Sequence, residues 1–112
     1  MDIAAIQAQL SEFASERDWN QYHSPKNLAM ALAVEAAELM EIFQWVGSEE
    51  SRRIVDSPSK LQAAAEEIAD ISIYLFRLAD VLGLDIERVI KEKIEQNAAK
   101  YPEDEPHRWS ME

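Results

Sequence analysis

Hydrophobic residues recur every three or four positions along most of the chain, which is the spacing of one face of an α-helix. The pattern predicts four helices, over about residues 2–17, 24–46, 57–82 and 85–100. Start signals agree with it, because Ser24 and Ser57 each directly precede a proline, as an N-cap precedes a first-turn residue. Gly47 and Gly83 follow the second and third helices as expected stop signals.

The remaining segments add little regular structure. The stretch "SEESRRIVD" has room for a short helical turn, and no stretch of useful length alternates polar and apolar residues as a strand does. We therefore expect an all-α fold of the four-helix-bundle type, with antiparallel helices and short connections, in one domain over residues 1–102. Residues 103–112 lack periodicity and are expected to form an extended or mobile tail.

The second predicted helix carries an acid inside its apolar stripe. With about 100° per residue, the apolar side chains within about 40° of Glu35 include Leu28, Leu39, Ile42 and Val46. Glu38 falls at the edge of the same stripe, whereas Glu41 is expected to face solvent. The three acids of this helix are therefore not equivalent.

The third predicted helix repeats the arrangement. Glu67 borders its apolar stripe, Asp70 lies just outside it, and Tyr74 falls between the two in angle. Each helix thus offers two acids at positions i and i+3, about 5–6 Å apart at Cβ. One such pair is usually a solvated flank, but two pairs at apolar edges indicate a shared site.

Four carboxylates converge if the two acidic faces meet. Buried carboxylates that close together repel and lose hydration, so some must be protonated or bound to cations. Mg²⁺ takes carboxylate oxygens, keeps several waters and binds substrate phosphates. On the fourth helix, Lys93 shares a face with Val89 and Ile90, where its ammonium either reaches water or meets phosphate oxygens.

Composition narrows the classes of partner. The formal net charge of −11 disfavours nucleic-acid polymers and anionic membranes, and it suits multivalent cations. The absence of cysteine excludes disulfides and thiolate metal sites. No apolar run approaches the roughly 20 residues of a membrane span. We expect a soluble cytoplasmic protein.

The acids also lie in a recognisable context. "EAAE", then 28 residues, then "EIAD" resembles the Glu-x-x-Glu…Glu-x-x-Asp signature of the MazG-like all-α nucleoside triphosphate pyrophosphohydrolases. The similarity continues through "RDWNQYHSPKN", "EIFQW", "EEIADISIYL" and "KIEQNAAKYP". These stretches resemble the short, single-domain branch of the family that contains dCTP pyrophosphatases, and they span about residues 16–102.

This resemblance implies hydrolysis of a nucleoside triphosphate, dCTP or a related deoxynucleotide, to the monophosphate and pyrophosphate. It implies Mg²⁺ as cofactor, with Mn²⁺ as a substitute, and the same four acids as catalytic metal ligands: Glu35, Glu38, Glu67 and Asp70. Substrate-binding positions of the family match Trp19, His23 and Trp45 around the base, and Tyr74, Lys93 and Asn97 at sugar or phosphate. Family members associate through their helices as dimers or tetramers, so we expect a core completed in a homo-oligomer, a tetramer with a dimer as the alternative.

Two other classes of function compete with this interpretation. A ferritin-like di-metal redox bundle uses Glu-x-x-His motifs, and here neither His23 nor His107 follows a glutamate by three residues. A non-enzymatic acidic interaction module would spread its charge over exposed faces, and the position of Glu35 inside the stripe argues against it. The preferred base, the number of metal ions and any general base stay open from the sequence.

Overall fold

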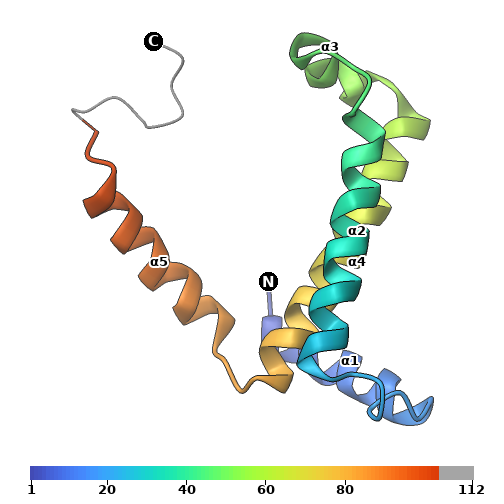
Figure 1. The fold of residues 1–112 in the computed structure, drawn as a ribbon, viewed down its shortest axis with the longest axis vertical. Coiled ribbons are helices and arrows are strands. Elements are labelled where there is room, and N and C mark those ends of the chain that lie inside the picture. The colour runs from blue at the N-terminus through green and yellow to red at the C-terminus, as the bar shows by residue number, and fades with distance from the viewer. Residues whose placement is uncertain (104–112) are drawn as a thin grey trace.

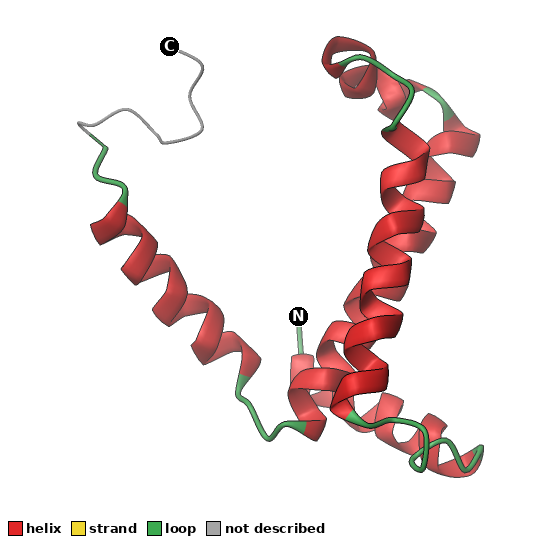
Figure 2. Ribbon diagram, viewed as in Figure 1, coloured by secondary structure: helices red, strands yellow, loops and turns green. Residues whose placement is uncertain are grey.

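A computed structural model describes residues 1–103 and gives them an all-helical structure, with no strand in that range (Figure 2). The elements are α1 (Ile3–Glu16), α2 (Pro25–Phe43), α3 (Ser48–Arg52), the 3-10 helix η1 (Arg53–Asp56), α4 (Pro58–Val81) and α5 (Ile86–Lys100). The all-α class is confirmed. The four predicted helices correspond to α1, α2, α4 and α5, and the short predicted turn to α3 with η1.

Side-chain caps begin three of the four long helices. The carboxylate of Asp2 accepts a hydrogen bond from the backbone N–H of Ala5 at 2.9 Å. Asp85 caps α5 in the same way, at 3.1 Å from the N–H of Arg88. The hydroxyl of Ser24 caps α2, whereas Ser57 makes no side-chain capping bond and α4 begins at its proline. Local sequence is therefore sufficient to start these helices.

Two helices end in a Schellman motif, whose left-handed residue redirects the chain. After α4, Gly83 has φ 70°, and the N–H of Leu84 donates to the carbonyl of Ala79 at 2.9 Å. After α1, Asp18 takes the same place with φ 57°, and the N–H of Trp19 donates to the carbonyl of Ala14 at 2.9 Å. Short polar side chains such as aspartate tolerate this conformation better than most. The second motif turns Trp19 back toward the helices.

The predicted end of α2 was wrong by three residues. The helix stops at Phe43, and Gly47 is not its terminating residue. Gly47 has an extended conformation with φ −74° and serves as the N-cap of α3. Residues 44–46 form the turn that joins α2 to α3.

An antiparallel hairpin of α2 and α4 forms the body of the molecule (Figure 1). The most deeply buried residues of the hairpin include Leu28 and Ala64, and the small alanine allows the two helices to approach closely. Helix α1 crosses the base of the hairpin, where Ala14 is buried and the amide of Gln7 donates to the carbonyl of Phe76 on α4 at 2.9 Å. The long helices therefore hold the predicted acids, and α1 closes one end.

Helix α5 diverges from the hairpin, as Figure 1 shows. Its apolar residues Val89, Ile90 and Ile94 are 40%, 47% and 60% exposed. The radius of gyration is 17.3 Å, whereas a compact domain of this length has about 13 Å. One chain thus leaves the fourth side of the expected bundle open.

Two predictions, the tail and the domain boundary, concern the end of the described range. The predicted tail falls almost entirely on residues 104–112, which lie outside the described residues. The domain boundary at residue 102 therefore stays a prediction. Among the helices of residues 1–103, none combines the length and apolarity needed to cross a lipid bilayer.

Candidate functional site

Three acids meet on the inner side of the hairpin. Glu35 and Glu38 lie on α2 and Glu67 lies on α4, and each offers a carboxylate oxygen within 4.8 Å of those of the other two. The i, i+3 spacing places the first two on one helix face, and antiparallel packing brings α4 against that face. The convergence predicted from two separate helices is confirmed for these three acids.

Two of the acids point oxygen atoms into the protein. Glu35 Oε2 and Glu67 Oε2 are buried and have no hydrogen-bond partner among the described residues. Leaving a buried carboxylate oxygen unpaired is costly, because the interior does not replace its hydration. These two atoms therefore indicate a position where a proton or a cation is required.

Mutual repulsion changes the protonation of the cluster. The pKa of Glu35 is raised, first because the adjacent carboxylate of Glu67 favours its protonated form, then by burial and by the charges of Glu67 and Asp70. The proximity of Glu38 acts in the opposite direction. The pKa of Glu38 is raised by the adjacent carboxylate of Glu35 and by its charge. Without a metal, the cluster therefore tends to hold a proton that a divalent cation would displace.

The donor set fits a hard divalent cation. It consists of carboxylate oxygens, and no histidine of the described range joins it. Asp70, the fourth predicted ligand, lies one turn after Glu67 and outside the cluster of three acids. Its negative charge contributes to the raised pKa of Glu35. Oxygen donors at this separation suit Mg²⁺ completed by waters and phosphate oxygens. The role of Asp70 as a ligand stays a prediction.

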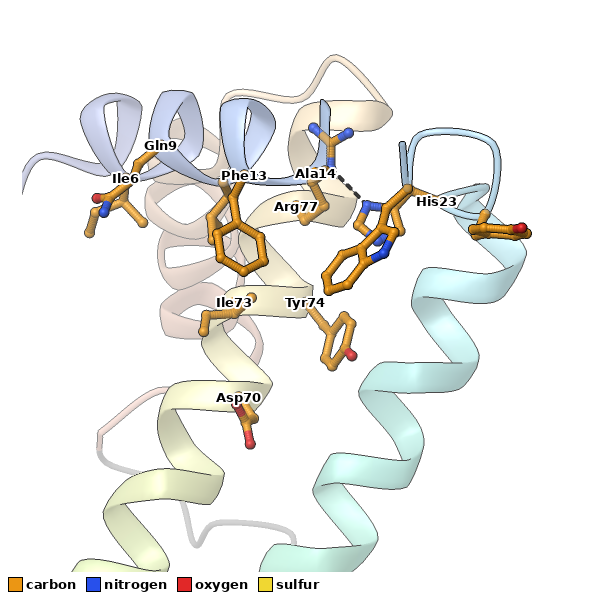
Figure 3. A pocket seen from close by; sticks show the side chains of 12 residues that line it. Ile6, Gln9, Phe13, Ala14, His23, Asp70, Ile73, Tyr74 and Arg77 are labelled. Atoms are coloured by element: carbon orange, nitrogen blue, oxygen red, sulfur yellow. Dashed lines mark hydrogen bonds between the residues drawn. The ribbon is translucent and has the colours of Figure 1, made fainter. Parts of the chain in front are cut away.

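A cavity of 670 Å³ lies at the end of the hairpin that α1 closes (Figure 3). It has three walls: one from α1, one from the loop between α1 and α2, and one from α4. The residues are Ile6, Gln9, Leu10, Phe13 and Ala14; Trp19, Tyr22 and His23; and Asp70, Ile73, Tyr74 and Arg77. Its lining is mostly apolar and aromatic, as in pockets that hold a flat ring.

Two of the three predicted base-binding residues, Trp19 and His23, line this cavity. Trp19 packs edge-to-face on Phe13, with ring centroids 5.5 Å apart, and lies tilted against His23 at 6.1 Å. Tyr74 lines the opposite wall. The structure therefore brings together three of the six predicted substrate-binding residues.

One face of α4 joins the acids to the cavity. Glu67, Asp70, Tyr74 and Arg77 follow one another at intervals of three or four residues, so their side chains lie in one row along the helix. Asp70 belongs to both regions, because it lies next to the cluster and also lines the cavity. The acids and the cavity therefore form one continuous site.

Comparison with known proteins agrees with this geometry. The sequence profile of the MazG-like family matches residues 30–112. The chain belongs to the MazG-like family. It resembles the crystal structure of a pyrophosphatase from Archaeoglobus fulgidus, with 39% identity, a TM-score of 0.84, and coverage of 92% of this chain and 94% of that one.

Curated relatives of this MazG-like chain include mammalian proteins named dCTP pyrophosphatase 1. The Bos taurus protein is 44% identical and the Homo sapiens protein 41% identical, each over 101 residues that make up 90% of this chain. The chain spans only 58% of the length of each of them.

Three predicted residues lie away from the site of the MazG-like chain. Trp45 is 88% exposed beyond the end of α2, while the cavity lies beside the start of that helix, about 27 Å away along the helix axis. Lys93 and Asn97 are exposed on α5, which diverges from the hairpin (Figure 1). A single chain therefore does not bring Trp45 to the cavity or Lys93 and Asn97 to the acids, and the roles of these residues stay predictions.

Arg77 was missed by the sequence interpretation. It is a charged residue only 9% exposed, and it lines the cavity beside His23 (Figure 3). The signal was present, because Arg77 lies ten residues after Glu67 on the helix face of the acids. An arginine on such a face is commonly solvated. Only the contacts that Arg77 makes with the distant loop between α1 and α2 show that it is buried instead.

Proposed function

We propose that this chain is a Mg²⁺-dependent nucleoside triphosphate pyrophosphohydrolase that converts dCTP, or a related deoxynucleotide, to the monophosphate and pyrophosphate. One observation carries the proposal: a cluster of three carboxylates lies one helical turn from an aromatic cavity of 670 Å³. Membership of the MazG-like family and the similarity to mammalian dCTP pyrophosphatases support it.

The row of side chains on α4 from Glu67 to Arg77 suggests how the substrate would be oriented. Between Glu67 and Arg77 the helix rises about 15 Å, so one nucleotide can lie along it with its phosphates beside the acids and its base in the cavity. Trp19 and Tyr74 would hold the base and sugar by stacking and packing. Glu35, Glu38, Glu67 and Asp70 would hold the metal.

Charge explains why a cation is needed. The chain has a net charge of −11, and carboxylates repel a triphosphate strongly. Mg²⁺, when bound, neutralises phosphate charge and activates water for attack on phosphorus. The acids of this chain place that cation, and Glu38, which is more exposed than Glu35, is the better placed of the two to accept a proton from water.

A homo-oligomer, for which we propose a tetramer, would complete the site. The exposed apolar residues of α5 and the extended shape of one chain both favour burial against another copy. Within one chain, Trp45 does not line the cavity, and Lys93 and Asn97 lie on the diverging α5, so these residues would contribute to the site of a neighbouring copy. Lys93 and Asn97 would then contact phosphate or sugar.

Assembly is testable on α5. Ile90→Glu places a charge on its exposed apolar face and is expected to convert the oligomer to monomers, because a buried charge without a partner opposes association. Sedimentation velocity measures the outcome. Ala99→Glu adds the same charge on the opposite side of the helix and is expected to leave the oligomer intact. Wild-type protein sedimenting as a monomer would refute the assembly.

We propose a cytoplasmic location, which the lack of cysteine and the nucleotide substrate support. The competing functions gain no support from the site. A ferritin-like redox centre would need histidine ligands, and a purely acidic interaction module gives no reason for two buried, unpartnered carboxylate oxygens.

The decisive experiment identifies the products. The purified chain is incubated with each common ribo- and deoxyribonucleoside triphosphate, with Mg²⁺ or with EDTA, and products are separated by anion exchange. We expect pyrophosphate and monophosphate, fastest from dCTP, and no turnover with EDTA. Orthophosphate as the product, or turnover independent of metal, would refute the proposed function.

A further inference from the structure

Arg77 connects α4 to the loop between α1 and α2. Its Nη2 donates to Asn20 Oδ1 at 2.8 Å, and its Nε donates to His23 Nδ1 at 3.2 Å. Its Nη1 lies 3.6 Å from Asp80 Oδ2 on the same helix. A buried guanidinium that uses all three nitrogens keeps a fixed orientation, because its donors form a rigid fork.

The bond to Nδ1 decides where His23 carries its proton. A neutral imidazole has one N–H and one acceptor nitrogen, and an arginine N–H can donate only to the acceptor. With Nδ1 accepting from Arg77, the proton must be on Nε2. The ring is also kept neutral, because burial and then the nearby charge of Arg77 lower the pKa of His23. His23 is therefore a neutral Nε2–H donor.

The remaining nitrogen of His23 is available to a ligand. His23 and Arg77 both line the cavity, and Figure 3 shows the bond between them at its edge. Arg77 occupies Nδ1, and within the described residues no hydrogen bond is recorded for Nε2. A hydrogen-bond donor of fixed position in a mostly apolar cavity discriminates between ligands, because a ligand that presents another donor leaves both groups unpaired.

We propose that Arg77 is a positioning residue that holds His23 as an Nε2–H donor, so that the base subsite selects a ring edge with hydrogen-bond acceptors. The nature of the ligand rests on the proposed function. Cytosine offers two adjacent acceptors, N3 and O2, whereas uracil accepts at O2 and O4 and carries N–H at N3. The proposal places Nε2–H of His23 opposite N3, where cytosine accepts and uracil would present a donor to a donor. A donor at that position favours dCTP over dUTP.

The competing explanation is that Arg77 only braces the loop. Asn20→Ala is the matched control, because it removes the shortest bond between Arg77 and the loop and leaves the bond to His23. Arg77→Met removes both. If Arg77 only braces the loop, the two variants are expected to have similar effects. If Arg77 positions His23, only Arg77→Met is expected to change the protonation state of His23.

The first test measures directly which imidazole nitrogen of His23 carries the proton, and it does not depend on enzymatic turnover. The full chain has two histidines, so His107→Gln leaves His23 as the single one. Long-range ¹H–¹⁵N NMR of the imidazole at neutral pH is expected to give a neutral ring protonated at Nε2, both in this background and with Asn20→Ala. With Arg77→Met we expect a mixture of protonation states. A proton on Nδ1, a charged ring, or an unchanged spectrum in Arg77→Met would overturn the assignment. The spectrum of the protein that carries His107→Gln alone decides the protonation of His23, even if Arg77→Met does not fold.

The second test reads selectivity. The ratio of kcat/KM for dCTP to that for dUTP is expected to fall about tenfold in Arg77→Met and to stay within about twofold in Asn20→Ala, the scale of one hydrogen bond. In a His23→Ala background, Arg77→Met is expected to have no further effect on the ratio. An unchanged ratio would overturn the selectivity role. Lack of turnover with every nucleotide would refute the proposed function instead, and the NMR result would still decide the role of Arg77.

Discussion

Glu38→Gln is expected to lower kcat/KM for dCTP by about a thousandfold and to leave the helical content unchanged. Glu38 contributes an oxygen to the cluster of three acids, and glutamine keeps its shape but removes its charge. An exposed position on a helix tolerates this change without loss of fold. Steady-state kinetics with Mg²⁺ and far-ultraviolet circular dichroism measure the two expectations.

Glu41→Gln is the matched control for this loss. Glu41 lies one turn further along α2, is exposed, and takes no part in the cluster. We expect its activity to remain within about twofold of wild type, as for most surface substitutions. Equal losses in both variants would indicate a general effect of surface charge, and full activity of Glu38→Gln would contradict the metal assignment.

Glu35→Gln is expected to remove most of the stabilisation by Mg²⁺. Without metal, this variant should be as stable as wild type or more stable, because repulsion among the acids is relieved and an amide N–H can donate to the unpartnered Glu67 Oε2. With Mg²⁺, wild type should gain roughly 5 °C in Tm while the variant gains little, because it has lost a ligand. Thermal denaturation in EDTA and in excess Mg²⁺ measures both effects.

The same variant should change the pH dependence. The pKa of Glu35 in the folded protein lies above the ordinary value of 4.5. Its protonation therefore stabilises the metal-free fold below that value, and this contribution is lost as the pH rises through the folded-state pKa. In EDTA, the loss of wild-type Tm as the pH rises above the ordinary value of 4.5 should be smaller in Glu35→Gln. Marked destabilisation of metal-free Glu35→Gln would contradict this picture and indicate a structural role.

The helices and the acids could be predicted because their determinants are local. Asp2, Ser24 and Asp85 cap helices through bonds to residues three positions away, and the i, i+3 acid pairs need only the geometry of one helix. The end of α2 was harder to predict, because Gly47 starts the next helix rather than ending this one. A glycine is compatible with both roles.

The cavity wall on α1 and the role of Arg77 could not be predicted in this way. Helix α1 gave no chemical motif, and Phe13 contributes only as an apolar surface against Trp19. Arg77 is separated from His23 by 54 positions in the chain, and their bond requires the particular turn after α1. Periodicity carries no information about such distant pairs.

The sequence by itself determined the all-α class, the helix starts and the two acid pairs, since each depends on residues within one or two helical turns. Only the tertiary structure decided that Glu35 and Glu67 direct unpartnered oxygens inward, that Asp70 borders the cavity, and that α5 leaves the hairpin. The physical reason is that these features depend on how helices pack and how loops turn. Packing joins residues that are distant in sequence, and local patterns do not specify which of them meet.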